Sequence, residues 1–184
     1  MNSYVRGETC TQERISAMIH LYYGDGKGKT SAALGLLLRA SGAGLRVALA
    51  RFLKDDTSAE LIPLRTLPYV SLLPSPKKMK FLWEMTEEEK AACAADTRRL
   101  FEASVSQDCD VLILDEVTDA VNSGLLQEEA LLSFLDRKPE NMEVILTGRE
   151  PSDSVKQRAD YITQFLSRRH PYDQGFQARR GIEY

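Results

Sequence analysis

The sequence is poor in cysteine, with only Cys10, Cys93 and Cys109. They are odd in number and widely spaced, so neither a disulfide framework nor a structural zinc site is expected. No apolar run approaches the ~20 residues of a membrane span, and the polar first 17 residues lack the apolar core of a signal peptide. The net charge of −3 shows no basic excess for nucleic acid or an anionic membrane surface. We therefore expect a cytoplasmic protein with reduced thiols and with no nucleic-acid or membrane partner.

The chain has 184 residues, enough for one domain with a full core. Met18 directly precedes the first apolar run, so residues 18–184 are expected to form a single domain. Residues 1–17 are expected to be an N-terminal extension, and an arm, a lid and a tag-like segment, flexible or ordered, all fit its composition.

A glycine-rich segment at residues 24–31 carries the clearest chemical signal. Its residues are Gly24, Asp25, Gly26, Lys27, Gly28, Lys29, Thr30 and Ser31. It lies between a predicted strand and a predicted helix, which is the setting of a phosphate-binding loop. Glycines let backbone N–H groups converge on an anion at the helix N-terminus. Lys29 would add a cation on the phosphates, and the Thr30 hydroxyl would help to hold a magnesium ion.

This loop is one residue shorter than the usual form. Only three residues separate Gly24 from Gly28, and when the loop is aligned on Lys29, Tyr23 replaces the usual first glycine. A shorter loop has fewer amides for a triphosphate. Its chemistry therefore need not be ordinary transfer of the γ-phosphoryl group.

Apolar runs alternate with helical patterns along the rest of the chain. Strands are predicted at 19–23, 46–53, 67–73, 110–116, 142–148 and 161–166, and helices at 31–43, 86–106, 126–137 and 152–160. Thr86 and Glu89 form a capping box at the start of the second helix. This alternation predicts an α/β fold in three layers, with a mostly parallel sheet covered by helices on both faces.

Asp115 and Glu116 end a predicted strand downstream of the loop. Parallel strands place their carboxyl ends at one edge, where ligands bind, so we expect both carboxylates to face the phosphate loop. At least one of them would hold Mg²⁺ or Mn²⁺ together with Thr30, as in a Walker B strand. The sequence leaves open which one contacts the metal directly.

An aromatic pair, Phe81 and Trp83, lies in a lysine-flanked loop. Two interpretations are open: the rings pack onto the core, or they cover a flat ligand.

The chain resembles the ATP:corrinoid adenosyltransferase family, whose substrates include cob(I)alamin and cob(I)yrinic acid a,c-diamide. The matching segments are 24–30, Arg39-Ala40-Ser41-Gly42-Ala43-Gly44, Arg51-Phe52-Leu53-Lys54, Phe81-Leu82-Trp83-Glu84, Leu114-Asp115-Glu116-Val117-Thr118, Lys138-Pro139, Ile145-Leu146-Thr147-Gly148-Arg149, His170-Pro171-Tyr172-Asp173-Gln174-Gly175 and Gly181-Ile182-Glu183-Tyr184. The short loop and the Gly-Ile-Glu-Tyr end are the most specific of these.

The resemblance implies a P-loop NTPase (RecA-like) architecture, a homodimer, and transfer of the 5′-deoxyadenosyl group of ATP to the cobalt(I) of a corrinoid, with triphosphate as the leaving group. It implies catalytic roles for Lys29 and Glu116, and ATP contacts along residues 24–31 and at Arg39. It also places Phe81 and Trp83 against the corrinoid. A reduced flavin or flavodoxin-type protein would supply the electron.

Two other functions fit the sequence less well. A P-loop ATPase or kinase would act at the γ-phosphate, but the shortened loop and the Phe81/Trp83 segment favour adenosyl transfer. A nucleotide-responsive binding module without chemistry is disfavoured because Lys29, Thr30, Asp115 and Glu116 are all intact.

Overall fold

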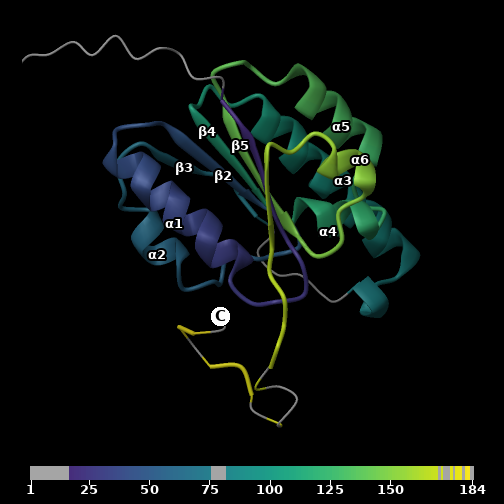
Figure 1. The fold of residues 1–184 in the computed structure, drawn as a ribbon. Helices are drawn as coiled ribbons and strands as arrows, with labels where there is room; N and C mark the ends of the chain where they lie inside the picture. Colours follow the sequence, from purple (N-terminus) through teal and green to yellow (C-terminus); the bar gives the residue numbers. More distant parts are fainter. Residues whose placement is uncertain are drawn as a thin grey trace, which may run out of the picture.

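A computed structural model describes residues 17–75, 82–169, 171, 175, 177–179 and 181–182 of the chain. It shows one sheet with helices on both faces (Figure 1). The strands are β1 (Ile19–Tyr23), β2 (Val47–Arg51), β3 (Val70–Leu72), β4 (Val111–Asp115), β5 (Glu143–Gly148) and β6 (Tyr161–Gln164). The helices are α1 (Lys29–Gly42), α2 (Leu61–Leu64), the 3₁₀ turn η1 (Leu82–Glu84), α3 (Glu87–Val105), α4 (Val117–Asn122), α5 (Glu128–Arg137) and α6 (Asp153–Lys156).

The six strands are all parallel and lie in the order β3-β2-β4-β5-β1-β6. Each strand therefore ends at the same edge of the sheet. The registers place Arg51 beside Asp115 and Tyr23 beside Gly148. The segments that follow β1, β2, β4 and β5 consequently share one edge, where a parallel sheet binds its ligands.

Alternate residues of the central strands pack into two separate cores. Val111 and Ile113 of β4 face α1 and α2, whereas Leu112 and Leu114 face the layer of α3, α4, α5 and α6. All four side chains are almost fully buried. Burial on both faces explains why this strand is a continuous apolar run rather than an alternating one.

The predicted three-layer α/β fold is confirmed, and each predicted strand has an observed counterpart. The Thr86/Glu89 capping box is present: the N–H of Glu89 donates to the Thr86 hydroxyl, and the Thr86 N–H donates to the Glu89 carboxylate. The short helices α2 and α4 were not predicted.

The helix predicted over residues 152–160 is shorter than expected, because α6 ends at Lys156. Asp160 explains the difference. Its N–H donates to the Ile19 carbonyl and its carboxylate accepts from the Ile19 N–H at 2.8 Å. The chain must therefore leave the helix early enough to join β1 as strand β6.

No helix within the described residues is long and apolar enough to cross a membrane.

Candidate functional site

The glycine-rich loop runs from the end of β1 to the start of α1, with Gly28 as the N-cap of the helix. It is anchored by backbone hydrogen bonds: the Gly24 N–H donates to the Arg149 carbonyl at 3.0 Å, and the Gly26 N–H donates to the Phe165 carbonyl at 2.9 Å. Since these two amides are engaged by the protein, an anion would have to use other donors of the loop and of the first turn of α1.

Glycine is required at two of these positions by the close approach of the chain after β6. A Cβ atom at Gly24, whose φ is 116°, would lie 2.2 Å from the Phe165 carbonyl oxygen. A Cβ at Gly26 would lie 2.7 Å from the Phe165 carbonyl carbon. Both neighbours are backbone atoms that cannot move aside independently, so the loop and the segment after β6 form one packed unit.

Lys29 is folded back over the loop. Its Nζ donates to the carbonyl oxygens of Gly24 at 2.7 Å and Gly26 at 2.9 Å. Burial lowers the pKa of this ammonium, and the positive charge of Arg149 adds to the effect. The ammonium is therefore held directly over the curve of the loop.

A compact polar cluster lies beside the loop, centred on Asp115 at the end of β4. The Thr30 hydroxyl donates to Asp115 Oδ1 at 3.0 Å, and the Thr147 hydroxyl donates to the same oxygen at 2.7 Å. Thr147 in turn accepts the Glu116 N–H at 2.8 Å. Asp115 is only 1% exposed, so this network fixes its carboxylate in one orientation.

Lys54 completes the cluster. Its Nζ donates to Thr30 Oγ1 at 2.9 Å and to Asp115 Oδ2 at 2.8 Å, and it lies 3.2 Å from Glu116 Oε1. Burial disfavours the charged form of Lys54, but the carboxylates of Asp115 and Glu116 outweigh that cost and raise the pKa of the ammonium. For Glu116, burial is the largest influence and raises the pKa of the carboxyl, while Lys54 lowers it.

The donor set of this cluster suits a magnesium ion. Mg²⁺ prefers oxygen ligands and is usually held by one or two carboxylates, with water and substrate phosphates as the remaining ligands. The Thr30 hydroxyl and the Asp115 and Glu116 carboxylates supply such oxygens, and they already converge on a cation, the Lys54 ammonium. In the described part of the chain, no three His, Cys, Asp or Glu side chains could hold a metal by themselves.

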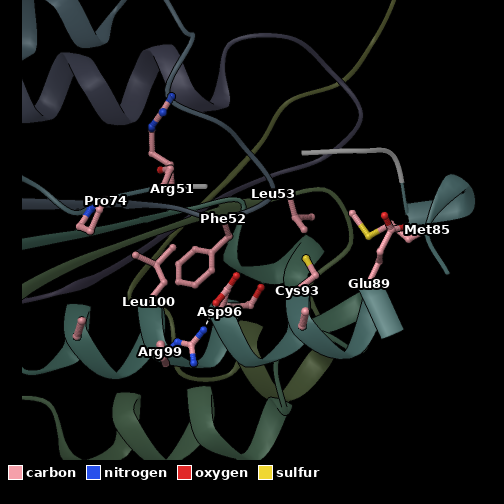
Figure 2. Close-up of a pocket in the computed structure, with 14 residues that line it drawn as sticks. Arg51, Phe52, Leu53, Pro74, Met85, Glu89, Cys93, Asp96, Arg99 and Leu100 are labelled. Carbon is pink, nitrogen blue, oxygen red and sulfur yellow. Dashed lines mark hydrogen bonds and ion pairs between the residues drawn. The ribbon is translucent and has the colours of Figure 1, made fainter. Parts of the chain in front are cut away.

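A cavity of about 590 Å³ opens next to the cluster, between the end of β2, the segment after β3, and α3 (Figure 2). Phe52 points into it toward α3, whereas the Arg51 side chain points to the opposite face of the sheet (Figure 2). The residues that line it are Arg51, Phe52, Leu53, Pro74, Ser75, Met85, Glu89, Ala92, Cys93, Asp96, Thr97, Arg99, Leu100 and Ala103. Because Leu53 directly precedes Lys54, the cavity and the polar cluster adjoin along the chain.

Among the residues proposed for the site from sequence, Lys29, Thr30, Asp115 and Glu116 come together at the sheet edge. Arg39 does not join them: it is exposed, and it follows Lys29 by ten residues, or ~15 Å along helix α1. Ser31 lies in the first turn of α1, and Asp25 and Lys27 are exposed on the loop.

The aromatic pair is described only in part. Trp83 lies in η1 just before α3 and is 77% exposed. This exposure favours the interpretation in which the ring covers a flat ligand over the one in which it packs onto the core. Phe81 lies outside the described residues.

Lys54 was not assigned a role in the site by sequence reasoning, and Thr147 was placed at the sheet edge without one. Thr147 lies near the end of β5 and Lys54 follows β2, so the rule that the ends of parallel strands converge could have brought Lys54 to the same edge. The direction of the Lys54 side chain depends on the backbone at Leu53, whose φ of 55° is uncommon for a residue other than glycine. The sequence does not reveal such a backbone conformation.

A parallel sheet, a glycine-rich loop opening a helix, and a Thr–Asp–Glu cluster at the neighbouring strand end define the class of P-loop nucleotide-binding proteins. Within that class, residues 16–184 match the family model "ATP:corrinoid adenosyltransferase BtuR/CobO/CobP". The chain belongs to this family, as its motifs predicted.

Individual relatives with the same family name are also similar to this chain. The chain is 29% identical over 176 residues to "Corrinoid adenosyltransferase" of Pseudomonas aeruginosa, covering 94% of this chain and 85% of the relative. It is 30% identical over 172 residues to "Corrinoid adenosyltransferase CobA" of Salmonella typhimurium, covering 91% and 85%. A solved structure, "The cytoplasmic domain of EssC", matches 91% of this chain and 37% of its own length with a TM-score of 0.47 and 19% identity, which is too distant a likeness to bear on function.

Proposed function

We propose that this protein transfers the 5′-deoxyadenosyl group of ATP to the cobalt(I) of a corrinoid and releases triphosphate. The observation that carries the proposal is the arrangement at the sheet edge. In a chain of this family, a short phosphate loop and a cation-holding Thr–Asp–Glu cluster adjoin a large, mainly apolar cavity. The loop and cluster suit the triphosphate, and the cavity suits an apolar part of the second substrate.

The chemistry makes few demands on side chains. Cobalt(I) is itself a strong nucleophile: its electron pair forms the cobalt–carbon bond at carbon 5′, while the bond from that carbon to the α-phosphate oxygen breaks and its electrons leave with the triphosphate. The protein therefore needs to orient the two substrates and stabilise the negative charge of the leaving group.

The charge-stabilising groups would be Lys29 and the metal-binding cluster. Lys29 would exchange its loop carbonyls for phosphate oxygens, which requires only a rotation of its side chain. Thr30, Asp115 and Glu116 would hold magnesium. A magnesium ion there would neutralise charge on the triphosphate as it departs. The short loop fits this chemistry, since carbon 5′ rather than the γ-phosphorus is the centre attacked.

The corrinoid would approach from the side of the cavity and of the Trp83 turn. Phe52, Leu100 and their neighbours offer an apolar wall, and the Trp83 side chain is largely exposed. Burial raises the pKa of the Cys93 thiol in this wall, which disfavours the thiolate form that would compete as a nucleophile or as a cobalt ligand. Trp83, with Phe81, would keep a ligand off one face of cobalt.

The remaining expectations concern the partners of the reaction. A reduced flavin or flavodoxin-type protein would supply the electron that converts cobalt(II) to cobalt(I). We also expect a homodimer in the cytoplasm, where Cys93 and Cys109 remain reduced thiols.

The test is an incubation of the purified protein with ATP, Mg²⁺ and chemically reduced cobalamin, followed by absorbance spectroscopy in the dark and after illumination. Adenosyl transfer predicts a cobalt–carbon bond that light destroys. Absence of a light-sensitive product, with the protein folded and ATP bound, would reject the proposal.

A further inference from the structure

Lys54 follows β2, a buried strand that is paired on both sides, and its side chain lies in the polar cluster. Its ammonium is the common partner of the Thr30 hydroxyl and of the carboxylates of Asp115 and Glu116, at 2.9, 2.8 and 3.2 Å. These are the same three side chains that suit a magnesium ion. The ammonium thus stands where the oxygens of the cluster converge.

The backbone fixes the lysine in this place. Phe52, two residues earlier, is 1% exposed, and its N–H donates to the Asp115 carbonyl at 2.8 Å. Leu53 then adopts a φ of 55°, and Glu116 on the opposite side of the contact adopts a φ of 62°. Each of these conformations costs energy in a residue other than glycine, and such costs persist where the surroundings impose them. Lys54 is therefore directed at the cluster rather than extended into solvent.

The Lys54 ammonium and a metal ion cannot both occupy the position between Thr30, Asp115 and Glu116. Thr30 gives its hydroxyl proton to Asp115 and accepts from Lys54. A magnesium ion bound to Thr30 would lie ~2.0–2.1 Å from Oγ1, on the side of this oxygen that the Lys54 ammonium now contacts. A divalent cation so close to the ammonium would also meet strong like-charge repulsion, which is only partly screened in a buried site. One cation must leave before the other can bind.

We propose that Lys54 is a resident counter-cation that holds the metal position in the nucleotide-free protein and yields it when magnesium arrives with ATP. This inference rests on the proposed metal role of Thr30, Asp115 and Glu116. It implies that the free protein binds metal weakly, and that triphosphate oxygens supply the additional ligands that let magnesium displace the lysine. The released ammonium then lies within reach of the triphosphate as a further cation.

The test measures metal binding directly rather than activity. Mn²⁺ is titrated into nucleotide-free protein and the free ion is followed by electron paramagnetic resonance, for wild type and for Lys54→Met. Removing the competing charge should tighten Mn²⁺ binding by about tenfold or more. The melting temperature of Lys54→Met should be lower than that of wild type without metal, because two carboxylates lose their cation, and it should rise more on addition of Mg²⁺.

Lys90→Met is the matched control, because Lys90 is a half-buried lysine of α3, outside the polar cluster, whose ammonium pairs with the exposed Glu87. Its Mn²⁺ affinity should equal that of wild type. If Lys54→Met does not fold without metal, Lys54→Gln serves instead, since its neutral amide can still donate a hydrogen bond to Asp115.

The outcomes separate this inference from the proposed function. Wild type that binds Mn²⁺ with ATP, combined with an unchanged nucleotide-free affinity in folded Lys54→Met or Lys54→Gln, would overturn the role of Lys54 alone. Wild type that binds no Mn²⁺ even with ATP would overturn the metal site itself, and this inference with it.

Discussion

At the residue scale, Asp115 organises the site through its hydrogen bonds to three other elements. Its carboxylate accepts hydrogen bonds from Thr30, Thr147 and Lys54, which come from α1, β5 and the loop after β2. The network leaves the Glu116 carboxylate, 30% exposed, as the more accessible acid. We therefore expect Glu116 to be the carboxylate that meets a metal ion or its water ligands, with Asp115 as the residue that positions Thr30.

Replacing Lys29 by alanine should lower adenosylation by about 10²–10³, because one preorganised contact to the developing charge is lost. Stability should change little, since the ammonium binds only two carbonyls of the loop. Initial rates and melting temperature, measured beside Lys90→Ala, decide the matter. Turnover close to that of wild type would remove Lys29 from the chemistry.

Glu116→Gln should raise the Mg²⁺ concentration needed for half-maximal rate by about tenfold or more, because a neutral amide is a poorer ligand for a hard cation. Glu129→Gln, an exposed acid of α5, is the control. Magnesium titrations of initial rate in both variants test the assignment, and equal shifts would contradict it. Asp56 would be a poor control, because it lies 3.6 Å from the buried guanidinium of Arg51.

At the element scale, the site is assembled by four strand ends and by the segment after β6, which packs on the phosphate loop. Figure 1 shows this yellow-green segment crossing the end of the sheet beside the loop before α1. The loop thus continues directly from β1 and contacts residues 165–167. The Ser167 N–H donates to Asp25 Oδ1 at 3.1 Å.

Two glycine substitutions should have opposite effects on stability. Gly24→Ala places a Cβ 2.2 Å from the Phe165 carbonyl oxygen and should destabilise the protein by roughly 1–3 kcal/mol. Gly35→Ala, within α1 with no atom within 4 Å of the new Cβ, should stabilise it by roughly 0.5–1 kcal/mol. Urea unfolding of both variants measures the two changes. A stable Gly24→Ala variant would show that the loop is not held against Phe165.

The sequence predicts the long elements better than the short ones. Buried strands such as β4 are continuous apolar runs, and the capping box marks the start of α3. Hydrophobic pattern and local chemistry are therefore enough to predict these elements. Helices α2 and α4 have four and six residues, too few to show a period. Helix α6 ends at Lys156, before Asp160 meets Ile19 in a contact between residues distant in sequence.

At the scale of the whole molecule, motifs at strand ends predict which residues lie at the site. The contacts that their side chains make there depend on local backbone and side-chain geometry. Lys29, Thr30, Asp115 and Glu116 were brought together by the parallel sheet alone. Arg39 lies away from the loop because helix α1 carries it along its length, so its expected contact with ATP stays a prediction. Lys54 shows the converse, since the turn of the backbone at Leu53, which the sequence does not reveal, directs its side chain into the site.

Trp83→Ala should weaken corrinoid binding while leaving the melting temperature almost unchanged, because the ring is 77% exposed. Trp83 is the only tryptophan in the chain, so quenching of its fluorescence by added hydroxocobalamin reports binding in the wild type. Equilibrium dialysis serves for the variant. A large fall in melting temperature with unchanged corrinoid affinity would return this ring to a purely structural role.

The bond that breaks in ATP is the most direct measure of the central claim. Phosphorus NMR of the products, after reaction with ATP, Mg²⁺ and chemically reduced cobalamin, distinguishes cleavage at carbon 5′ from cleavage at the γ-phosphate. The site predicts free triphosphate in an amount equal to the adenosylated corrinoid, and formation of both about 10²–10³ more slowly when Lys29 is replaced by alanine. Accumulation of ADP and inorganic phosphate, without triphosphate, would contradict the account and identify the protein as a phosphate-transferring P-loop enzyme.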